Sequence, residues 1–242
     1  VGDKEMEIDA QIDEIPLNKT KNVRDADFNV YTCLQIGNQI WLRENLRTTR
    51  LNDGTELVEG VQYIVGSSSD IYGVYYAKQV LFDDLFNTQP GWRWTSYGPK
   101  NLAPKEFKVA MWDDWMQLFK TLGVPDSETK CDKWVIEEEY LFEEAEVAYK
   151  LKSDTGWPIV DGNNGNGFNT YTFSVMPGGY INLETKEELG VGQMASIFAA
   201  CFDTAGAPHF AFRFEPKAKG VYKYLPHYKT VMSNIRCVKN ID

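Results

Sequence analysis

The stretch NVYTCLQIGNQIWL, residues 29–42, decides the fold class of this chain. It contains two runs of β-branched and aromatic residues, 29–36 and 39–42, separated by the dipeptide Gly37-Asn38. Two such runs joined by a two-residue turn are typical of a β-hairpin. The sequence therefore predicts that the compact part of the chain opens with two antiparallel strands.

The clearest helical pattern covers residues 112–122. Its apolar side chains recur at i, i+3, i+4, i+7 and i+10, and they are Trp112, Trp115, Met116, Phe119 and Leu122. This spacing places them on one face of a helix. Asp113 and Asp114 fall in the first turn, where the helix dipole favours acids, and Gly123 and Pro125 end the helix.

A second helix, with an acidic face, is predicted over residues 134–148. Its clustered glutamates could bind Ca²⁺, but a solvated helix face is the simpler interpretation. Further short strands are predicted at residues 168–175, 196–202, 210–214 and 233–238. Short strands with one or two helices, and without regular βαβ alternation, predict an α+β fold.

Composition limits the classes of partner. The chain has 242 residues, a formal net charge of −10, and 43% hydrophobic residues, enough for a packed core. An acidic surface repels phosphate backbones and anionic membranes, so nucleic acid and lipid surfaces are not expected partners. No run of about 18 apolar residues occurs, so no transmembrane segment is expected.

The chain is predicted to have a short leader followed by one domain. Residues 1–26 are polar, acidic and interrupted by Pro16, which indicates an N-terminal leader or an edge strand. Residues 27–242 are predicted to form a single domain. The cysteines are widely spaced, and they are Cys33, Cys131, Cys201 and Cys237. Without a CxxC pair a zinc site is not expected, and both disulfides and free buried thiols are compatible with this spacing.

Short motifs follow one another in a fixed order along residues 27–240. They lie at residues 27–31, 36–41, 44–49, 52–55, 72–77, 151–157, 167–180 and 235–239. Their order and spacing resemble the Fibrobacter succinogenes major paralogous domain family. The resemblance implies a C-type-lectin-like fold, akin to that of the formylglycine-generating enzyme, with twisted antiparallel sheets of short strands and long loops. It also implies a secreted or cell-surface protein of the kind common in Bacteroidetes. The acidic first residues would suit the stretch after a lipid anchor on the precursor.

The chain departs from the family pattern at three places. Ala103 stands where the family has a cysteine, so Cys237 is expected to lack that partner. Met111 replaces a hydroxyl residue at the helix N-cap, a change expected to cost about 1 kcal/mol unless it is compensated. Residues 197–201 replace a stretch that carries hydroxyl side chains in the family. These differences indicate a divergent member.

The resemblance implies a non-catalytic module that binds a glycan or a surface protein. Recognition in C-type-lectin-like folds comes from long loops in the second half, here residues 156–167. The side chains there that could stack on a sugar or hydrogen-bond to it are Trp157, Asp161, Asn163, Asn164 and Asn166. A second aromatic patch in an apparent loop consists of Trp92, Trp94 and Tyr97. The alternative is a mobile loop over a buried Trp157.

Two other classes of function are compatible with the sequence. A structural or adhesive surface component is the first alternative. An enzyme is the second, either formylglycine-generating-like through Cys201 and Cys237 with copper, or a glycosidase with paired carboxylates. Asp and Glu are plentiful, and the fold decides whether two of them are paired for glycoside cleavage. The sequence does not reproduce the formylglycine-generating motif, and it lacks the Ca²⁺-binding motifs of lectins. We therefore expect no catalytic residue, no cofactor and no metal site.

Overall fold

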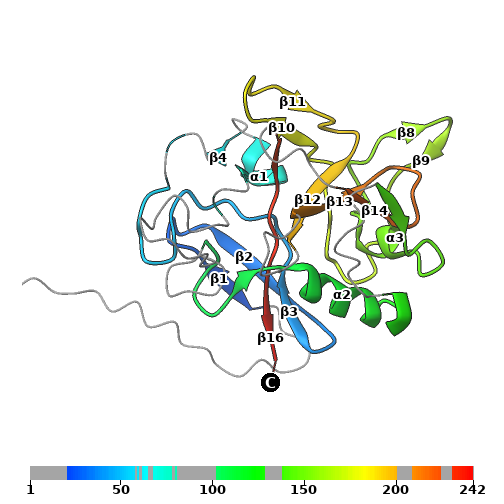
Figure 1. The fold of residues 1–242 in the computed structure, drawn as a ribbon, viewed down its shortest axis with the longest axis horizontal. Coiled ribbons are helices and arrows are strands. Elements are labelled where there is room, and N and C mark those ends of the chain that lie inside the picture. The colour runs from blue at the N-terminus through cyan, green and yellow to red at the C-terminus, as the bar shows by residue number, and fades with distance from the viewer. Residues whose placement is uncertain are drawn as a thin grey trace, which may run out of the picture.

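The computed structural model describes residues 21–57, 59, 62–64, 68–77, 80, 102–128, 138–200, 209–224 and 231–241. In these ranges the chain forms short strands in antiparallel sheets, with a few short helices beside them (Figure 1). The predicted α+β class is confirmed in this sheet-rich form. None of the helices in the described part of the chain is long and apolar enough to span a membrane.

The first sheet contains the predicted hairpin. Its strand order is β1-β2-β3-β16-β6, with the bounds Asn22–Arg24, Val30–Ile36, Gln39–Leu42, Cys237–Asn240 and Lys108–Val109 respectively. Ile36 pairs with Gln39 across the turn, where Gly37 has a φ of 59°. Strand β1 lies at the edge of this sheet, so residues 22–24 of the predicted leader form an edge strand. Residues 1–20 lie outside the described residues.

Two further sheets complete the architecture, together with a separate hairpin. The second has the order β11-β10-β15-β5-β4, with the bounds Glu188–Leu189, Tyr180–Asn182, Val231–Ser233, Tyr75–Ala77 and Gln62–Tyr63. The third has the order β12-β13-β14-β7, with the bounds Ala195–Ala200, His209–Phe214, Val221–Tyr224 and Glu139–Leu141. Strands β8 (Ile159–Val160) and β9 (Asn163–Asn164) form the separate hairpin. The predicted strands at 196–202 and 210–214 are confirmed as β12 and β13 in their described parts.

The helices are α1 (Ser69–Tyr72), α2 (Trp112–Thr121) and α3 (Val147–Leu151), with a 3₁₀ turn η4 (Asp126–Glu128). Helix α2 confirms the helix predicted from the apolar spacing at residues 112–122. The N-cap residue, Met111, has no side-chain oxygen to accept a hydrogen bond from the first turn of the helix. Its backbone N–H instead donates to Asp114 Oδ2 at 2.9 Å. Asp114 is buried and also pairs with Lys108 at 2.8 Å, so this carboxylate offsets part of the lost hydroxyl cap.

The second predicted helix, residues 134–148, is wrong. Residues 139–141 form strand β7, helix α3 begins only at Val147, and residues 129–137 lie outside the described residues. Glu139 and Tyr140 point to opposite faces of β7 and lie opposite Lys223 and Tyr222 of β14. Cross-strand pairing of unlike charges and of aromatic rings favours the strand over the helix expected from local sequence.

Two predicted strands differ in detail. Residues 168–175 form an irregular loop, because the Asn169 side chain accepts the Ser174 backbone N–H at 2.9 Å and competes with strand pairing. Thr172 and Ser174 also have positive φ angles, of 56° and 54°. The predicted closing strand at 233–238 is divided into β15 and β16, with Asn234–Arg236 between them.

The core consists of two clusters of buried side chains. The first joins α2 to the first and third sheets through aromatic side chains, and Trp41 and Trp115 lie 4.9 Å apart. The second lies around Tyr31, Tyr76 and Met232, and it includes Ala103 and both described cysteines. Cys33 and Cys237 are free buried thiols, while Cys131 and Cys201 lie outside the described residues.

A buried arginine ties distant segments of the chain together. The Arg236 guanidinium donates to Asn45 Oδ1 at 2.7 Å and to the carbonyls of Leu42 and Phe173, each at 3.0 Å. It also bonds to the Arg43 carbonyl and lies 4.6 Å from the centre of the Phe173 ring. Burial lowers the pKa of this side chain to about 9. Arg236 therefore fixes β16 against the end of the first hairpin and the loop at 173–174.

We expect Arg236→Met to lower the free energy of unfolding by at least about 3 kcal/mol, because several buried acceptors lose their donor at once. Chemical denaturation followed by tryptophan fluorescence measures this loss. The matched control is Arg24→Met, which removes an exposed arginine from β1 of the same sheet and should leave stability nearly unchanged. Equal losses in the two variants would contradict the role assigned to Arg236.

Candidate functional site

The predicted ligand loop, residues 156–167, contains the hairpin β8–β9. Asp161 and Gly162 form its turn with φ angles of 51° and 76°. Two positive φ angles at the centre of a two-residue loop are the signature of a type I′ turn, which matches the twist of paired strands. The side chains of Asp161, Asn163 and Asn164 are exposed on this hairpin, and Asn166 is half-buried. The hairpin thus presents three of the predicted polar side chains to solvent.

Trp157 supports this hairpin from within the core. Its side chain is 5% exposed, and its indole Nε1 donates to the Val175 carbonyl at 3.0 Å. Its backbone N–H donates to Asn166 Oδ1, also at 3.0 Å. The indole therefore lacks an exposed face for stacking on a sugar, and we assign it a structural role. Trp92, Trp94 and Tyr97 of the second predicted patch lie outside the described residues.

A buried lysine joins the hairpin to the turn between β13 and β14. Lys152 Nζ donates to the carbonyls of Gly165 and Glu215, both at 2.9 Å, and of Pro216 at 2.7 Å. The ammonium group also lies 4.6 Å from the centre of the Tyr149 ring. Burial lowers the pKa of Lys152 to about 8. The turn at residues 215–220 is therefore fastened to the base of the hairpin by one cation.

The tip of the hairpin is fastened to the same turn. Lys217 forms an ion pair with Asp161, and this contact lowers the pKa of the aspartate. Tyr149 donates its hydroxyl to the Lys217 carbonyl at 3.3 Å. In Figure 1 the hairpin β8–β9, helix α3 and strands β14 and β7 gather on one side of the molecule. The predicted loop thus has a defined position beside the third sheet.

On the third sheet, Tyr140, Tyr222 and Arg213 occupy one cross-strand row. Tyr140 lies opposite Tyr222, and Tyr222 lies opposite Arg213. The two tyrosine rings are 4.7 Å apart, and the guanidinium lies 4.6 Å from the centre of the Tyr222 ring and 5.5 Å from that of Tyr224. Tyr140 is 38% exposed and Tyr222 is half-buried. An ordered aromatic row therefore reaches solvent here.

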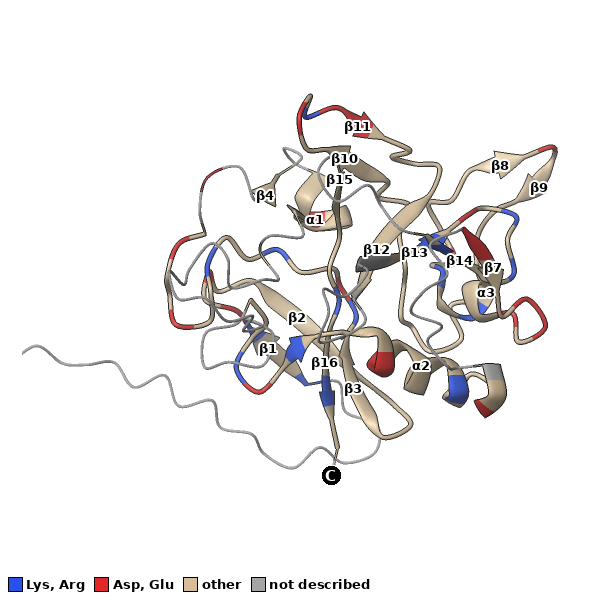
Figure 2. Cartoon of the chain, viewed as in Figure 1, with Lys and Arg blue, Asp and Glu red and all other residues tan. Residues whose placement is uncertain are grey.

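Two carboxylates hold Arg213 in this row. Glu138 accepts from Nη1 at 2.8 Å and from Nη2 at 2.7 Å, a bidentate pair, and Glu215 accepts from Nε at 2.8 Å. These partners raise the pKa of Arg213 against the opposing effect of burial. Figure 2 shows acidic β7 beside the basic residues of β13 and β14. Bidentate carboxylate binding fixes the plane of the guanidinium, so the row is rigid.

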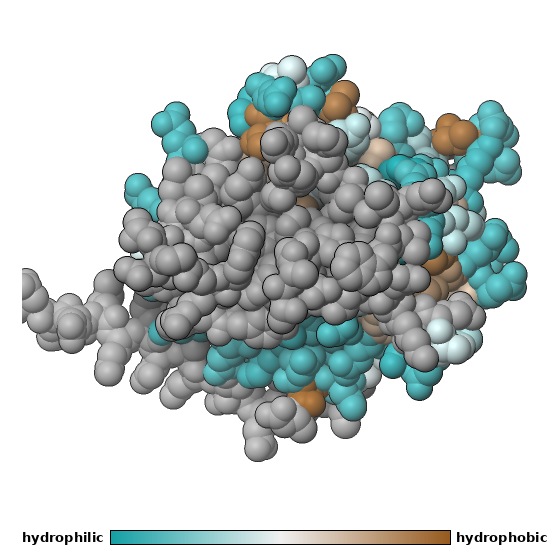
Figure 3. Space-filling model, in the orientation of Figure 1, coloured by the Kyte–Doolittle hydropathy of each residue, from teal (hydrophilic) through white to brown (hydrophobic). Residues whose placement is uncertain are grey.

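Tyr140 connects this row to the turn at 215–220. Its hydroxyl accepts the backbone N–H groups of Lys219 at 3.1 Å and Gly220 at 2.9 Å. The hairpin, the turn and the aromatic row thus form one continuous structure, which we call the turn surface. Its members are Glu138, Tyr140, Asp161, Asn163, Asn164, Arg213, Glu215, Lys217 and Tyr222. On the face drawn in Figure 3, the described surface is largely hydrophilic, with hydrophobic atoms in small groups.

The sequence identified only the hairpin part of the turn surface. The sequence wrongly predicts a helix at Glu138 and Tyr140, and it predicts Arg213 only as part of a strand with alternating side chains. Alternation along β13 and β14 shows which side chains share a face, but it does not show which strand lies beside which. The β7–β14 pairing brings Tyr140 to Tyr222 across about 80 residues of sequence, and no local pattern reports it.

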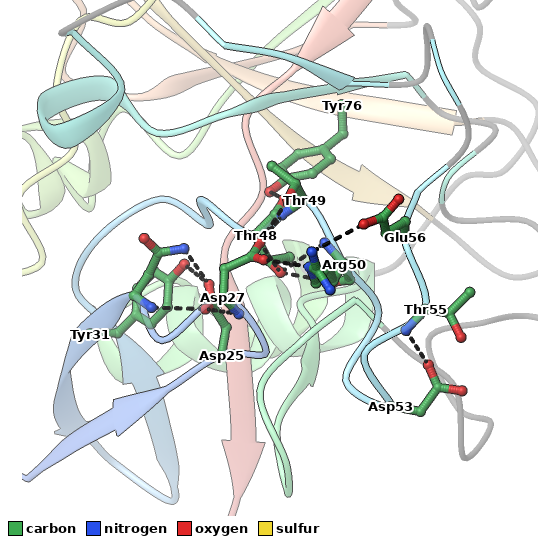
Figure 4. Close-up of polar contacts among 11 residues, drawn as sticks. Asp25, Asp27, Tyr31, Thr48, Thr49, Arg50, Asp53, Thr55, Glu56 and Tyr76 are labelled. Atoms are coloured by element: carbon green, nitrogen blue, oxygen red, sulfur yellow. Dashed lines mark hydrogen bonds and ion pairs between the residues drawn. The ribbon is translucent and has the colours of Figure 1, made fainter.

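A second polar cluster, around Asp25 and Asp27, serves the fold (Figure 4). Asp25 accepts the Tyr31 hydroxyl at 2.5 Å, and Asp27 accepts the Thr49 hydroxyl at 2.9 Å and pairs with Arg50 at 3.0 Å. Burial, reinforced by Asp25, raises the pKa of Tyr31. These bonds join the start of the first hairpin to the segment after it. In the described ranges, no group of three or more His, Cys, Asp or Glu side chains is arranged to hold a metal.

Comparison with known proteins gives one family match. The family model for the Fibrobacter succinogenes major domain matches residues 34–239, which is most of the chain and agrees with the resemblance seen in the motifs. The searches of curated proteins and of solved structures gave no match.

We expect stability to depend on pH through Lys152. The folded-state pKa is about 8 and the ordinary value is 10.5, so between them the unfolded chain binds more protons. The contribution of Lys152 to the free energy of unfolding therefore increases as pH rises from about 8 toward about 10.5. Chemical denaturation of wild type and of Lys152→Met, at neutral pH and near pH 10, measures this contribution. The quantity compared is the free energy of unfolding of wild type minus that of the variant, which should be larger near pH 10.

The control is Lys120→Met on α2, which removes a lysine that is 45% exposed. The change with pH should be larger for Lys152→Met than for this exposed variant. Equal changes in the two variants would show that the buried cation does not titrate as described.

Proposed function

We propose, from the premise that this chain belongs to the Fibrobacter succinogenes major domain family, that it is a non-catalytic binding module with a C-type-lectin-like fold. In this proposal it is secreted or held at the cell surface through a lipid anchor on the precursor, and its ligand is a glycan. The turn surface holds that ligand.

The observation that supports the proposal most strongly is the ordered row of Tyr140, Tyr222 and Arg213. Tyrosine combines an apolar ring with a polar tip, which suits a recognition surface that stays partly wet. Two sets of bonds fix this row before any ligand arrives. Arg213 forms a bidentate pair with Glu138, and backbone N–H groups donate to the Tyr140 hydroxyl. A preformed surface loses little side-chain entropy on binding, and this increases affinity.

The polar groups around the row favour a glycan over an apolar ligand. Asn163 and Asn164 offer exposed amides, which both donate and accept hydrogen bonds. Glu138 is 47% exposed and offers acceptor oxygens. Sugar hydroxyls need donors and acceptors in alternation beside an apolar ring face, and this surface presents both. The proposed surface therefore includes Asp161, Asn163 and Asn164, which the sequence predicts as ligand-binding, and leaves out the buried Trp157.

A non-catalytic role agrees with the state of the carboxylates. Hydrolysis of a glycosidic bond needs two carboxyl groups that face the bond from a cleft. Glu138 and Glu215 instead direct their oxygens at one guanidinium. They are engaged in holding Arg213, which fits binding better than proton transfer.

We expect Tyr222→Ala to weaken glycan binding about thirtyfold, because truncating a central aromatic contact commonly costs about 2 kcal/mol. A glycan array identifies a ligand for the wild type, and titration calorimetry then compares the variants. The matched control is Ile71→Ala on α1, which removes an apolar side chain that is 58% exposed, and it should bind like wild type.

Equal weakening in both variants would contradict the proposed location of the site. A wild type that binds no glycan on the array but captures a surface protein would favour the structural or adhesive alternative.

A further inference from the structure

We propose that the turn surface selects neutral glycans and rejects anionic ones such as uronates and sulfated sugars. This inference rests on the proposed function and adds the class of ligand. It follows from the pairing of every described cation on this surface.

Arg213 is the cation of the aromatic row, and its charge is already more than balanced. Glu138 occupies the Nη1 and Nη2 groups, and Glu215 occupies Nε. Only 20% of the Arg213 side chain is exposed, while Glu138 and Glu215 are 47% and 36% exposed. An approaching ligand therefore meets the carboxylates before it meets the guanidinium.

The neighbouring lysines are paired in the same way. Lys217 pairs with Asp161, and Lys219 pairs with Glu146 at 3.0 Å. Lys223 is buried on the opposite face of the sheet and pairs with Glu139. Because Arg213 alone holds two acids, carboxylates outnumber cations over this surface. Lys152 is fully buried, so it offers no charge to a ligand, and each exposed cation described here has an acidic partner.

The rest of the molecule adds to this local excess. The chain carries a formal net charge of −10, so an anionic oligosaccharide is repelled at long range as well as on contact. A carboxylate or sulfate group could reach Arg213 only by displacing Glu138 or Glu215. A neutral sugar has no such requirement, because its hydroxyls can donate to the carboxylate oxygens, and hydrogen bonds to charged acceptors are strong.

The test compares wild type with Glu138→Gln/Glu215→Gln. The probes are neutral oligosaccharides of glucose, xylose and mannose, and uronate oligosaccharides of equal length, titrated at low and at physiological salt. Wild type should bind its best neutral probe at least about tenfold more tightly than any uronate, because like charges at contact are unfavourable. The double variant removes both negative charges beside the Arg213 guanidinium, so it should gain uronate binding and lose most of this preference.

The control is Asp70→Asn/Asp126→Asn, which makes the same change in net charge at two side chains that are 87% and 85% exposed outside the turn surface. It should keep the preference of wild type. If the double glutamine variant fails to fold, Glu138→Gln alone is the substitute, because this glutamate is 47% exposed. It should reduce the ratio of neutral to uronate affinity, by less than the double variant would.

The outcomes separate the inference from the function on which it rests. Wild type that binds a uronate as tightly as a neutral probe would overturn the selectivity while leaving glycan binding in place. An equal change in the control variant would attribute the preference to net charge and overturn the role of Arg213 pairing. Wild type that binds neither class would overturn the proposed function itself.

Discussion

The buried guanidinium of Arg236 is the interaction on which the rest of this fold depends. It lies between β15 and β16, where the chain passes from the second sheet to the first, and it donates to Asn45, Leu42 and Phe173. The acceptors are neutral oxygens, so the cation is held by several oriented dipoles rather than by a contacting carboxylate. A buried charge of this kind tolerates only one arrangement of its partners, which fixes the first hairpin, the loop at 173–174 and the closing strand together.

The same physical device recurs nearer the surface. Lys152 is a buried cation whose three acceptors are backbone carbonyls, and it fixes the hairpin β8–β9 against the turn at 215–220. The two cations contact the same core cluster, because Arg236 lies beside Phe173 and Lys152 lies beside Trp157. The bonds of Arg236 in the core and those of Lys152 near the surface are therefore connected through packed side chains. The aromatic row on β7, β14 and β13 therefore stands on a scaffold with few alternative arrangements, as a preformed recognition surface requires.

The sequence predicted those parts of the fold that depend on local patterns. The hairpin at 29–42, helix α2 and strands β12 and β13 each follow from periodicity and turn residues. The error at β7 occurred where a distant contact decides the outcome, because β7 is a strand only beside β14. The error at residues 168–175 has a local cause, the bond from the Ser174 N–H to the Asn169 side chain. The site divides in the same way. The sequence predicted the loop at 156–167 that contains the hairpin. It did not predict the aromatic row, since Glu138, Tyr140, Arg213 and Tyr222 fall outside the family motifs. Several residues of those motifs instead make hydrogen bonds that hold the fold together, among them Asp27, Asn45 and Arg236.

The central claim is that ligand binds on the turn surface, and amide hydrogen exchange with and without a bound neutral oligosaccharide tests it most directly. Binding on the turn surface slows exchange in residues 161–166 and 213–222 when ligand is added, with little change in α1 or in β10 and β11. Slower exchange confined to the second sheet, with residues 213–222 unaffected, would contradict it.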